Sequence, residues 1–153
     1  MPGPIPRPDI HAVDVRRPVI LVADDEAMVR DLLTILMQGE GYFVLSARDG
    51  HEGLELSRKY PGAIDLVITD VHMPRMNGTD LCGHLLEERP GIQVLLVSGA
   101  DTREIAGQNI NLPLLRKPFD PETLTATVQA LLAARVQPAK HEPSGPRDDP
   151  PER

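Results

Sequence analysis

The chain has 153 residues, of which 41% are hydrophobic, and it carries a formal net charge of -7 at pH 7. This length is typical of one domain, and the acidic charge argues against a general affinity for DNA or RNA, which requires Lys and Arg to neutralise phosphates. A single cysteine excludes an internal disulfide, and a sequence without a signal peptide or a run of roughly 18 apolar residues indicates a cytoplasmic protein that does not insert into membranes.

Proline is concentrated at the two ends of the chain. Residues 1–17 and 136–153 are rich in proline and lack apolar periodicity. Because proline fixes φ and removes backbone donors, we expect both ends to be disordered and the folded domain to span residues 18–135. A ligand for an SH3-type domain is an alternative reading of the proline-rich tail, but PxxP spacing arises readily in any such segment.

Between these ends, short apolar runs alternate with segments of helical periodicity. The first run, VILVA at residues 19–23, precedes a helix whose apolar face is expected to contain Val29, Leu32, Leu33 and Leu36. Four later runs predict further strands, at residues 42–45, 66–69, 92–97 and 112–115.

Four further helices are predicted. The second helix covers residues 49–60, and the fourth is a short one at residues 101–107. The last begins at Asp120-Pro121-Glu122, an N-cap acid followed by proline at the first helical position. The third and last helices have apolar faces formed by Leu81, Cys82, Leu85 and Leu86 and by Leu124, Val128, Leu131 and Leu132, respectively.

This alternation predicts an α/β sandwich. Continuous apolar strands are buried on both faces, as in a parallel sheet covered by helices. Five strands favour the flavodoxin-like doubly wound (βα)5 fold with strand order 2-1-3-4-5. In such sheets the ligand site lies outside the carboxyl ends of the strands, near the switch point.

Charged and hydroxyl residues come directly after the predicted strands. Asp24 and Asp25 follow the first strand, Asp70 the third, Ser98 the fourth and Lys117 the fifth. Strands 1, 3, 4 and 5 are neighbours in the predicted order. We therefore expect carboxylates, a hydroxyl and an ammonium to converge at one edge of the sheet.

The chemistry of this set points to phosphoryl transfer. Crowded carboxylates repel one another, which raises pKa values or recruits a cation. Oxygen ligands favour Mg²⁺, and the sequence has no cluster of Cys and His that would indicate zinc. A metal, a lysine and a carboxylate nucleophile are the parts needed to form an aspartyl-phosphate. Taken alone, Asp70 would be read as a turn residue that caps backbone N–H groups.

Four motifs lie on the expected elements in order: VADDE (22–26), TDVHMPRMNG (69–78), VSGA (97–100) and RKPF (116–119). Through them the chain resembles the receiver domain of bacterial two-component response regulators over about residues 18–135. The stretch ERPGIQVLLVSG looks especially like receiver modules of hybrid histidine kinases.

The resemblance implies a phosphoacceptor and a Mg²⁺ site. Asp70 would be the phosphoacceptor and would also contact the metal. Asp25 would bind Mg²⁺ directly, Asp24 mainly through a water, and His72 through its backbone carbonyl.

The resemblance also assigns roles around the phosphoryl group. Ser98 would supply the hydroxyl that moves towards it, and Lys117 would neutralise its charge, with Pro118 forming the turn that follows. Gly78 would open the third helix. Glu26 is expected to be only a first-turn acid favoured by the helix dipole.

The implied function is that of a stand-alone phosphoacceptor signalling module in a two-component phosphorelay, regulatory rather than enzymatic. A sensor histidine kinase or a histidine phosphotransfer protein would donate the phosphoryl group. The face formed by helix 4, strand 5 and helix 5 would then signal to a protein partner. With no second folded domain after residue 136, no DNA-binding effector is expected.

Two departures from the family pattern concern signalling. Receivers usually carry Tyr or Phe three residues before the lysine, and this chain has Leu114 there, so aromatic switching is in doubt. Only 18 residues separate Ser98 from Lys117, which predicts a short or irregular fourth helix.

Three alternatives stay open. A pseudo-receiver would be a protein-interaction scaffold that is never phosphorylated, although the complete set of acids, serine and lysine argues against it. A haloacid-dehalogenase-type phosphatase needs a second Asp two residues after the nucleophile, where this chain has His72. A flavodoxin would need a Ser/Thr-rich phosphate loop and aromatics to stack the flavin, and aromatics make up only 3% of this chain.

Overall fold

The computed structural model describes residues 16–99 and 112–141. The helix predicted at residues 101–107 lies outside this range, as do the outer parts of the two proline-rich ends. In chain order the elements are β1 (Val19–Ala23), α1 (Ala27–Gly39), β2 (Phe43–Ala47), α2 (Gly50–Lys59), β3 (Leu66–Asp70), α3 (Gly78–Glu88), β4 (Gln93–Ser98), β5 (Leu114–Arg116) and α5 (Pro121–His141).

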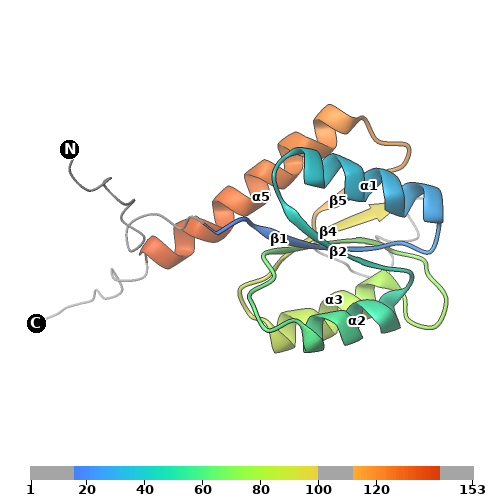
Figure 1. The fold of residues 1–153 in the computed structure, drawn as a ribbon, viewed down its shortest axis with the longest axis horizontal. Helices are drawn as coiled ribbons and strands as arrows, with labels where there is room; N and C mark the ends of the chain where they lie inside the picture. The colour runs from blue at the N-terminus through green and yellow to red at the C-terminus, as the bar shows by residue number, and fades with distance from the viewer. Residues whose placement is uncertain (1–15, 100–111, 142–153) are drawn as a thin grey trace, which may run out of the picture.

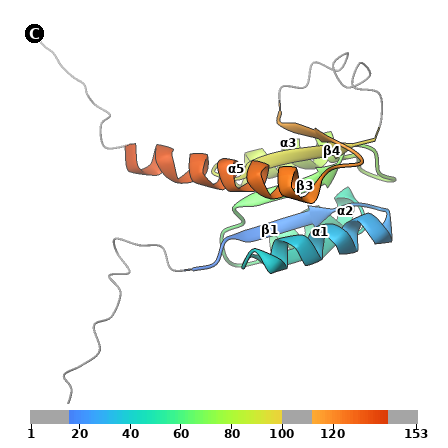
Figure 2. The ribbon, with the colours of Figure 1, turned by 90° about the horizontal axis from the view of Figure 1, so that it is seen from above.

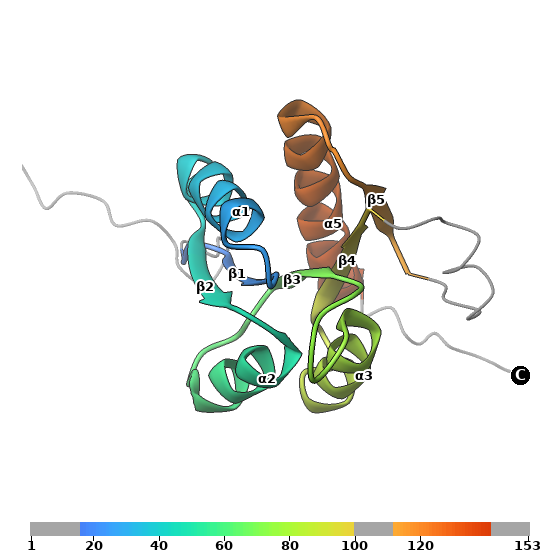
Figure 3. The same ribbon diagram turned by 90° about the vertical axis from the view of Figure 1, so that its right-hand side faces the viewer.

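The five strands form one parallel sheet with the order β2-β1-β3-β4-β5, which confirms the predicted flavodoxin-like topology. Helices α1 and α5 cover one face of the sheet, and α2 and α3 cover the other (Figures 1 and 3). The register pairs Asp70 with Val97 and Ser98 with Arg116, so neighbouring strands end at a common edge.

Each face of the sheet has its own hydrophobic core because successive strand residues point to opposite faces. Leu21 and Val67 pack beneath α2 and α3, whereas Ile20 and Ile68 pack beneath α1 and α5. Strands β1 and β3 are buried along their whole length. The continuous apolar runs in the sequence are therefore the signature of a sheet covered on both sides.

The apolar face of α1 differs from the predicted one. The buried residues of this helix are Leu33 and Met37, whereas Leu32 is 44% exposed. One residue along a helix is a rotation of about 100°, so a stripe centred on Leu33 and Met37 turns Leu32 outwards. Met28 and Ile35 are exposed on the same side as Leu32, at 85% and 64%.

One helix face and one strand boundary also differ from expectation. Leu86 is 37% exposed, so the buried face of α3 consists of the other three predicted residues. Strand β2 spans Phe43–Ala47 and so ends two residues later than predicted. The backbone of α5 runs from Pro121 to His141 (Figures 1 and 2).

Within the part of the chain that the structure describes, every helix falls short of the length and apolar character that a membrane crossing requires.

Asp65 ties three segments together at the amino edge of the sheet. It is 2% exposed, and Arg16 donates to both of its carboxylate oxygens, at 2.8 and 3.0 Å. The Val19 amide donates at 2.7 Å, and Arg135 of α5 lies 3.2 Å away. Burial raises the pKa of Asp65, but Arg16, the Val19 amide and Arg135 together lower it below its ordinary value.

We expect Asp65→Asn to lower the free energy of unfolding by about 1 to 3 kcal/mol at pH 7, because it weakens the charge-assisted hydrogen bonds that Arg16 and the Val19 amide donate to a buried carboxylate. A lowered folded-state pKa contributes stability that is present above the unfolded pKa of about 3.9 and lost as pH falls through the folded-state value. The difference from wild type in urea unfolding should therefore shrink as pH falls below about 4. Exposed Asp31→Asn on α1 is the control, and equal stability of the two variants at pH 7 would contradict the prediction.

Candidate functional site

Asp24 and Asp25 lie in the turn between β1 and α1. The Asp24 amide donates to the Ala47 carbonyl at 3.1 Å, and its Oδ1 accepts a hydrogen bond from the Glu26 amide at 2.9 Å. Arg30 donates to the Asp24 carbonyl at 2.9 Å. These contacts hold Asp24 in a fully buried position and leave Asp25 exposed at the surface of the same turn.

Asp70 is the last residue of β3 and is 7% exposed. Its Oδ1 accepts a hydrogen bond from the His72 amide at 3.3 Å. Gly78 begins α3, as predicted, and its amide donates to the Val71 carbonyl at 2.8 Å. A Cβ atom at Gly78 would come within 1.9 Å of the Asp70 carbonyl oxygen, so the return of the chain past Asp70 requires a glycine.

An ion pair that the sequence analysis missed anchors the loop between Asp70 and Gly78. Arg75, at a φ of 70°, pairs with Asp49, and its Nε lies 3.0 Å from Asp49 Oδ2. Asp49 also caps α2 by accepting from the Glu52 amide at 2.8 Å. Burial raises the pKa of Asp49, but the Glu52 amide and Arg75 lower it overall. The position of Asp49 directly before α2 indicates the cap in the sequence. Its ion pair with Arg75 has no such signal, because Arg75 lies far away along the chain.

Lys117 brings three carboxylates together after β5. Its Nζ lies 3.2 Å from Asp24 Oδ2, Glu26 Oε1 and Asp70 Oδ2. Its amide donates to the Ser98 carbonyl at 2.9 Å, which fixes the start of the side chain, and the Lys117–Pro118 peptide is cis. Burial lowers the pKa of Lys117, but Asp24 and Asp70 outweigh it and raise the pKa above its ordinary value.

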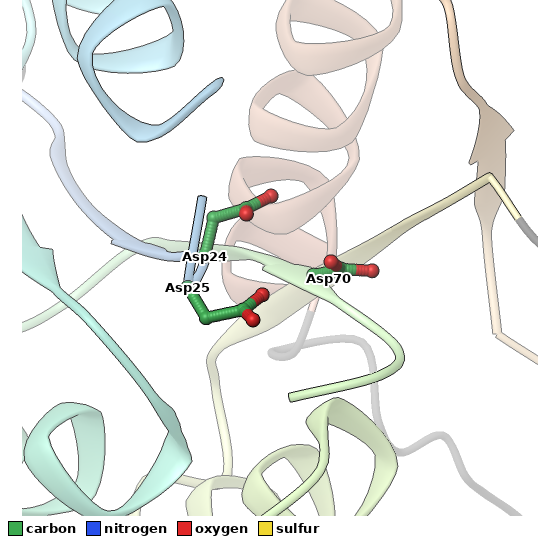
Figure 4. Close-up of side chains that lie close together, drawn as sticks. All are labelled: Asp24, Asp25 and Asp70. Carbon is green, nitrogen blue, oxygen red and sulfur yellow. The ribbon is translucent and has the colours of Figure 1, made fainter. Parts of the chain in front are cut away.

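Three carboxylates form a candidate metal site. Asp24, Asp25 and Asp70 each offer an oxygen, and these atoms lie within 4.8 Å of one another (Figure 4). Burial raises the pKa of Asp24, an effect that the Glu26 amide and Lys117 oppose and Asp70 reinforces. Among the described residues, no group donates a hydrogen bond to buried Asp24 Oδ2, and Lys117 meets it only as an ion pair. A hard cation that prefers oxygen ligands fits this donor set.

The remaining predicted residues differ in their burial. Ser98 is buried at the end of β4, and the His72 side chain is exposed. Leu114 is half-buried against the core beneath α2 and α3. Cys82 is fully buried, and burial raises its thiol pKa to about 12, which agrees with the expected core role.

Glu26 differs from expectation. It is the N-cap residue of α1 rather than a first-turn residue, and its side chain makes no capping hydrogen bond. Instead, its carboxylate is the third partner of Lys117. The sequence indicated only an acid near the start of a helix, which favoured an interaction of Glu26 with the helix dipole. It gave no sign of the contact with Lys117, because that contact depends on the turn after β5.

Comparison with known proteins identifies the family that this geometry fits. The family model described as the response regulator receiver domain matches residues 20–129. The chain belongs to this family. A receiver domain is a regulatory phosphoacceptor module of two-component signal transduction, so the resemblance seen in the four motifs is confirmed.

Curated relatives include DNA-binding regulators and a kinase. The chain is 35% identical over 132 residues to the alkaline phosphatase synthesis transcriptional regulatory protein SphR of Synechococcus elongatus, covering 79% of this chain and 51% of that protein. It is 35% identical over 119 residues to the sensor kinase CckA of Brucella abortus, covering 74% of this chain and 12% of the kinase. The chain thus spans about half the length of SphR and of similar curated regulators.

Solved structures show the same fold. The receiver domain of the hybrid histidine kinase CckA is 33% identical, with a TM-score of 0.64 over 74% of this chain and 98% of that one. The signal receiver domain of an HD domain-containing protein from Pseudomonas fluorescens is 27% identical, with a TM-score of 0.73 over 80% of this chain and 99% of that one.

We expect Gly78→Ala to lower the free energy of unfolding by about 1 to 3 kcal/mol, because its Cβ would overlap the Asp70 carbonyl oxygen and displace the loop. Gly83→Ala in the same helix is the matched control. Its Cβ meets nothing within 4 Å, and alanine favours an exposed helix interior by up to about 1 kcal/mol. Urea unfolding followed by circular dichroism measures both, and equal stability of the two variants would contradict the steric argument.

Proposed function

We propose that this receiver domain accepts a phosphoryl group on Asp70 from the phosphohistidine of a sensor histidine kinase or a histidine phosphotransfer protein, in a Mg²⁺-dependent reaction. The observation that carries the proposal is the Lys117 ammonium, 3.2 Å from both Asp24 and Asp70 at the carboxyl edge of the sheet. It places a cation beside a nearly buried carboxylate nucleophile, which is the arrangement that phosphoryl transfer requires.

In this reaction a carboxylate oxygen of Asp70 attacks the phosphorus in line with the leaving imidazole. The new P–O bond forms as the P–N bond breaks, and the imidazole nitrogen keeps the bonding electron pair and takes up a proton. The His72 amide orients the carboxylate through Oδ1. Lys117 neutralises phosphoryl oxygens, and the Ser98 hydroxyl moves in to donate a hydrogen bond to one of them.

A bound Mg²⁺ would neutralise charge on the phosphoryl oxygens during the transfer of the phosphoryl group. The residues that would hold it are Asp24, Asp25, Asp70 and the backbone carbonyl of His72. The fit rests on the carboxylate oxygens within 4.8 Å and on the Asp24 oxygen that has no hydrogen-bond donor among the described residues. A bound cation would also reduce the electrostatic repulsion among these carboxylates.

Support for a protein as phosphodonor comes from α1. Its exposed residue Leu32 lines a groove together with Lys117 and Phe119. Met28 and Ile35 are exposed on the same side of the helix as Leu32. An exposed apolar surface of this kind is typical of a protein contact, and it borders the reactive edge.

A panel of phosphorylated histidine kinases tests this point, because a true donor transfers its label to Asp70 within seconds to minutes whereas a mismatched kinase does not.

Signalling would follow as a shift in population. The phosphoryl group would favour the position of Ser98 drawn towards it and so change the face that includes β5 and α5, to which a downstream protein partner binds. The partners are proteins rather than nucleic acid, in keeping with the net charge of -7, and the site of action is the cytoplasm. Because Leu114 stands where an aromatic is usual, the shift would depend on Ser98 without aromatic switching.

Incubation with acetyl phosphate and Mg²⁺ tests the nucleophile. We expect wild type to gain one phosphoryl group by mass spectrometry and Asp70→Asn to gain none, because an amide cannot form the acyl phosphate. The exposed Asp31→Asn should be labelled like wild type. An unlabelled wild type would favour the unphosphorylated scaffold, and labelled Asp70→Asn would move the phosphoacceptor elsewhere.

Replacement of Asp25 tests the metal site. We expect Asp25→Ala to weaken Mg²⁺ binding by about tenfold or more, because it removes a carboxylate ligand, and to slow phosphorylation at low Mg²⁺. Asp25 is exposed, so unfolding and circular dichroism should match wild type. Isothermal titration calorimetry measures the affinity, with Asp31→Ala as control, and an unchanged affinity would remove Asp25 from the site.

A further inference from the structure

Glu26 belongs to the charged cluster although no motif assigns it a role there. The hydrogen bond from its amide to Asp24 Oδ1, at 2.9 Å, fixes its backbone in the acid turn. As the N-cap residue of α1 it makes no side-chain cap, and its carboxylate instead accepts a hydrogen bond from Lys117 at 3.2 Å. The side chain therefore acts on the lysine rather than on the helix.

Three acids surround the Lys117 ammonium. Lys117 donates hydrogen bonds to Glu26 Oε1 and Asp70 Oδ2 and meets Asp24 Oδ2 as an ion pair, and all three oxygens lie 3.2 Å from Nζ. The Asp24 and Asp70 side chains are 0% and 10% exposed, whereas that of Glu26 is 62% exposed. Of the three contacts, the one with Glu26 is therefore the easiest to exchange when another anion arrives.

From this geometry we infer that Glu26 is a positioning residue that holds Lys117 in the unphosphorylated site and competes with the phosphoryl group for its ammonium. An anionic phosphodonor must recruit the same ammonium, and it meets the negative charge of Glu26 as it approaches Asp70. Glu26 thereby lowers the rate at which the domain accepts phosphoryl groups. This inference rests on the proposed function of Asp70.

The experiment compares wild type with Glu26→Gln, which keeps the shape of the side chain and removes its charge. At saturating Mg²⁺, the second-order rate constant for phosphorylation by acetyl phosphate should rise about threefold to tenfold in Glu26→Gln, the size expected for one unit charge a few ångströms away at a water-exposed site. The rise should shrink towards none as ionic strength increases to about 0.5 M, because salt screens exposed charges. Phosphoramidate, which carries less negative charge than acetyl phosphate, should show a smaller rise.

Two controls separate this role from a general effect of charge. Glu40→Gln removes the same charge at the opposite end of α1 and should phosphorylate like wild type. Glu26→Asp keeps the charge and should lie closer to wild type than Glu26→Gln does. A Glu26→Gln rate equal to or below that of wild type, an equal rise in Glu40→Gln, or a rise that salt leaves unchanged would overturn the inference. Failure of wild type itself to label on Asp70 would instead overturn the proposed function.

Discussion

The contact between one ammonium and the acids at the carboxyl edge constrains the rest of this domain. Asp24 is fully buried, and a buried carboxylate without a counter-charge costs several kcal/mol. Lys117 supplies that charge from the turn after the outer strand β5, whereas Asp24 follows β1 and Asp70 ends β3. The order β2-β1-β3-β4-β5, with all strands parallel, is what brings these three chain segments within ion-pair distance.

The sequence predicted the strands better than the helix faces, for a physical reason. The central strand β1 is buried and apolar at every position, so the continuous run VILVA indicates a strand without any choice of face. Helix α1 has apolar residues on two sides, with Leu33 and Met37 in the core and Met28 and Ile35 at the surface. Periodicity alone does not say which side faces the sheet, because both satisfy helical spacing.

The same limit applies to the site. Placement at strand ends predicted that Asp24, Asp25, Asp70 and Lys117 would meet, since backbone topology alone brings strand ends together. The pairs Arg75–Asp49 and Lys117–Glu26 were not predicted. Each depends on how a loop directs one long side chain, and residues so far apart in sequence leave no spacing pattern. The structure thus shows ion pairs that depend on loop conformation and that the sequence motifs do not indicate.

One acid precedes strand β3 and another ends it, and their surroundings support the proposal of Asp70, rather than Asp65, as the nucleophile. Asp65, just before the strand, receives both Arg16 bonds and the Val19 amide at 2.7–3.0 Å, so both of its oxygens are occupied at the amino edge. Asp70, at the other end, has looser contacts of 3.2 Å with Lys117 and 3.3 Å with the His72 amide. Short charge-assisted hydrogen bonds hold a carboxylate oxygen more strongly than longer contacts do, so the contacts of Asp70 are the more readily exchanged. The amino-edge carboxylate is therefore a structural tie, whereas the carboxyl-edge carboxylate has the exchangeable contacts that the proposed nucleophile needs.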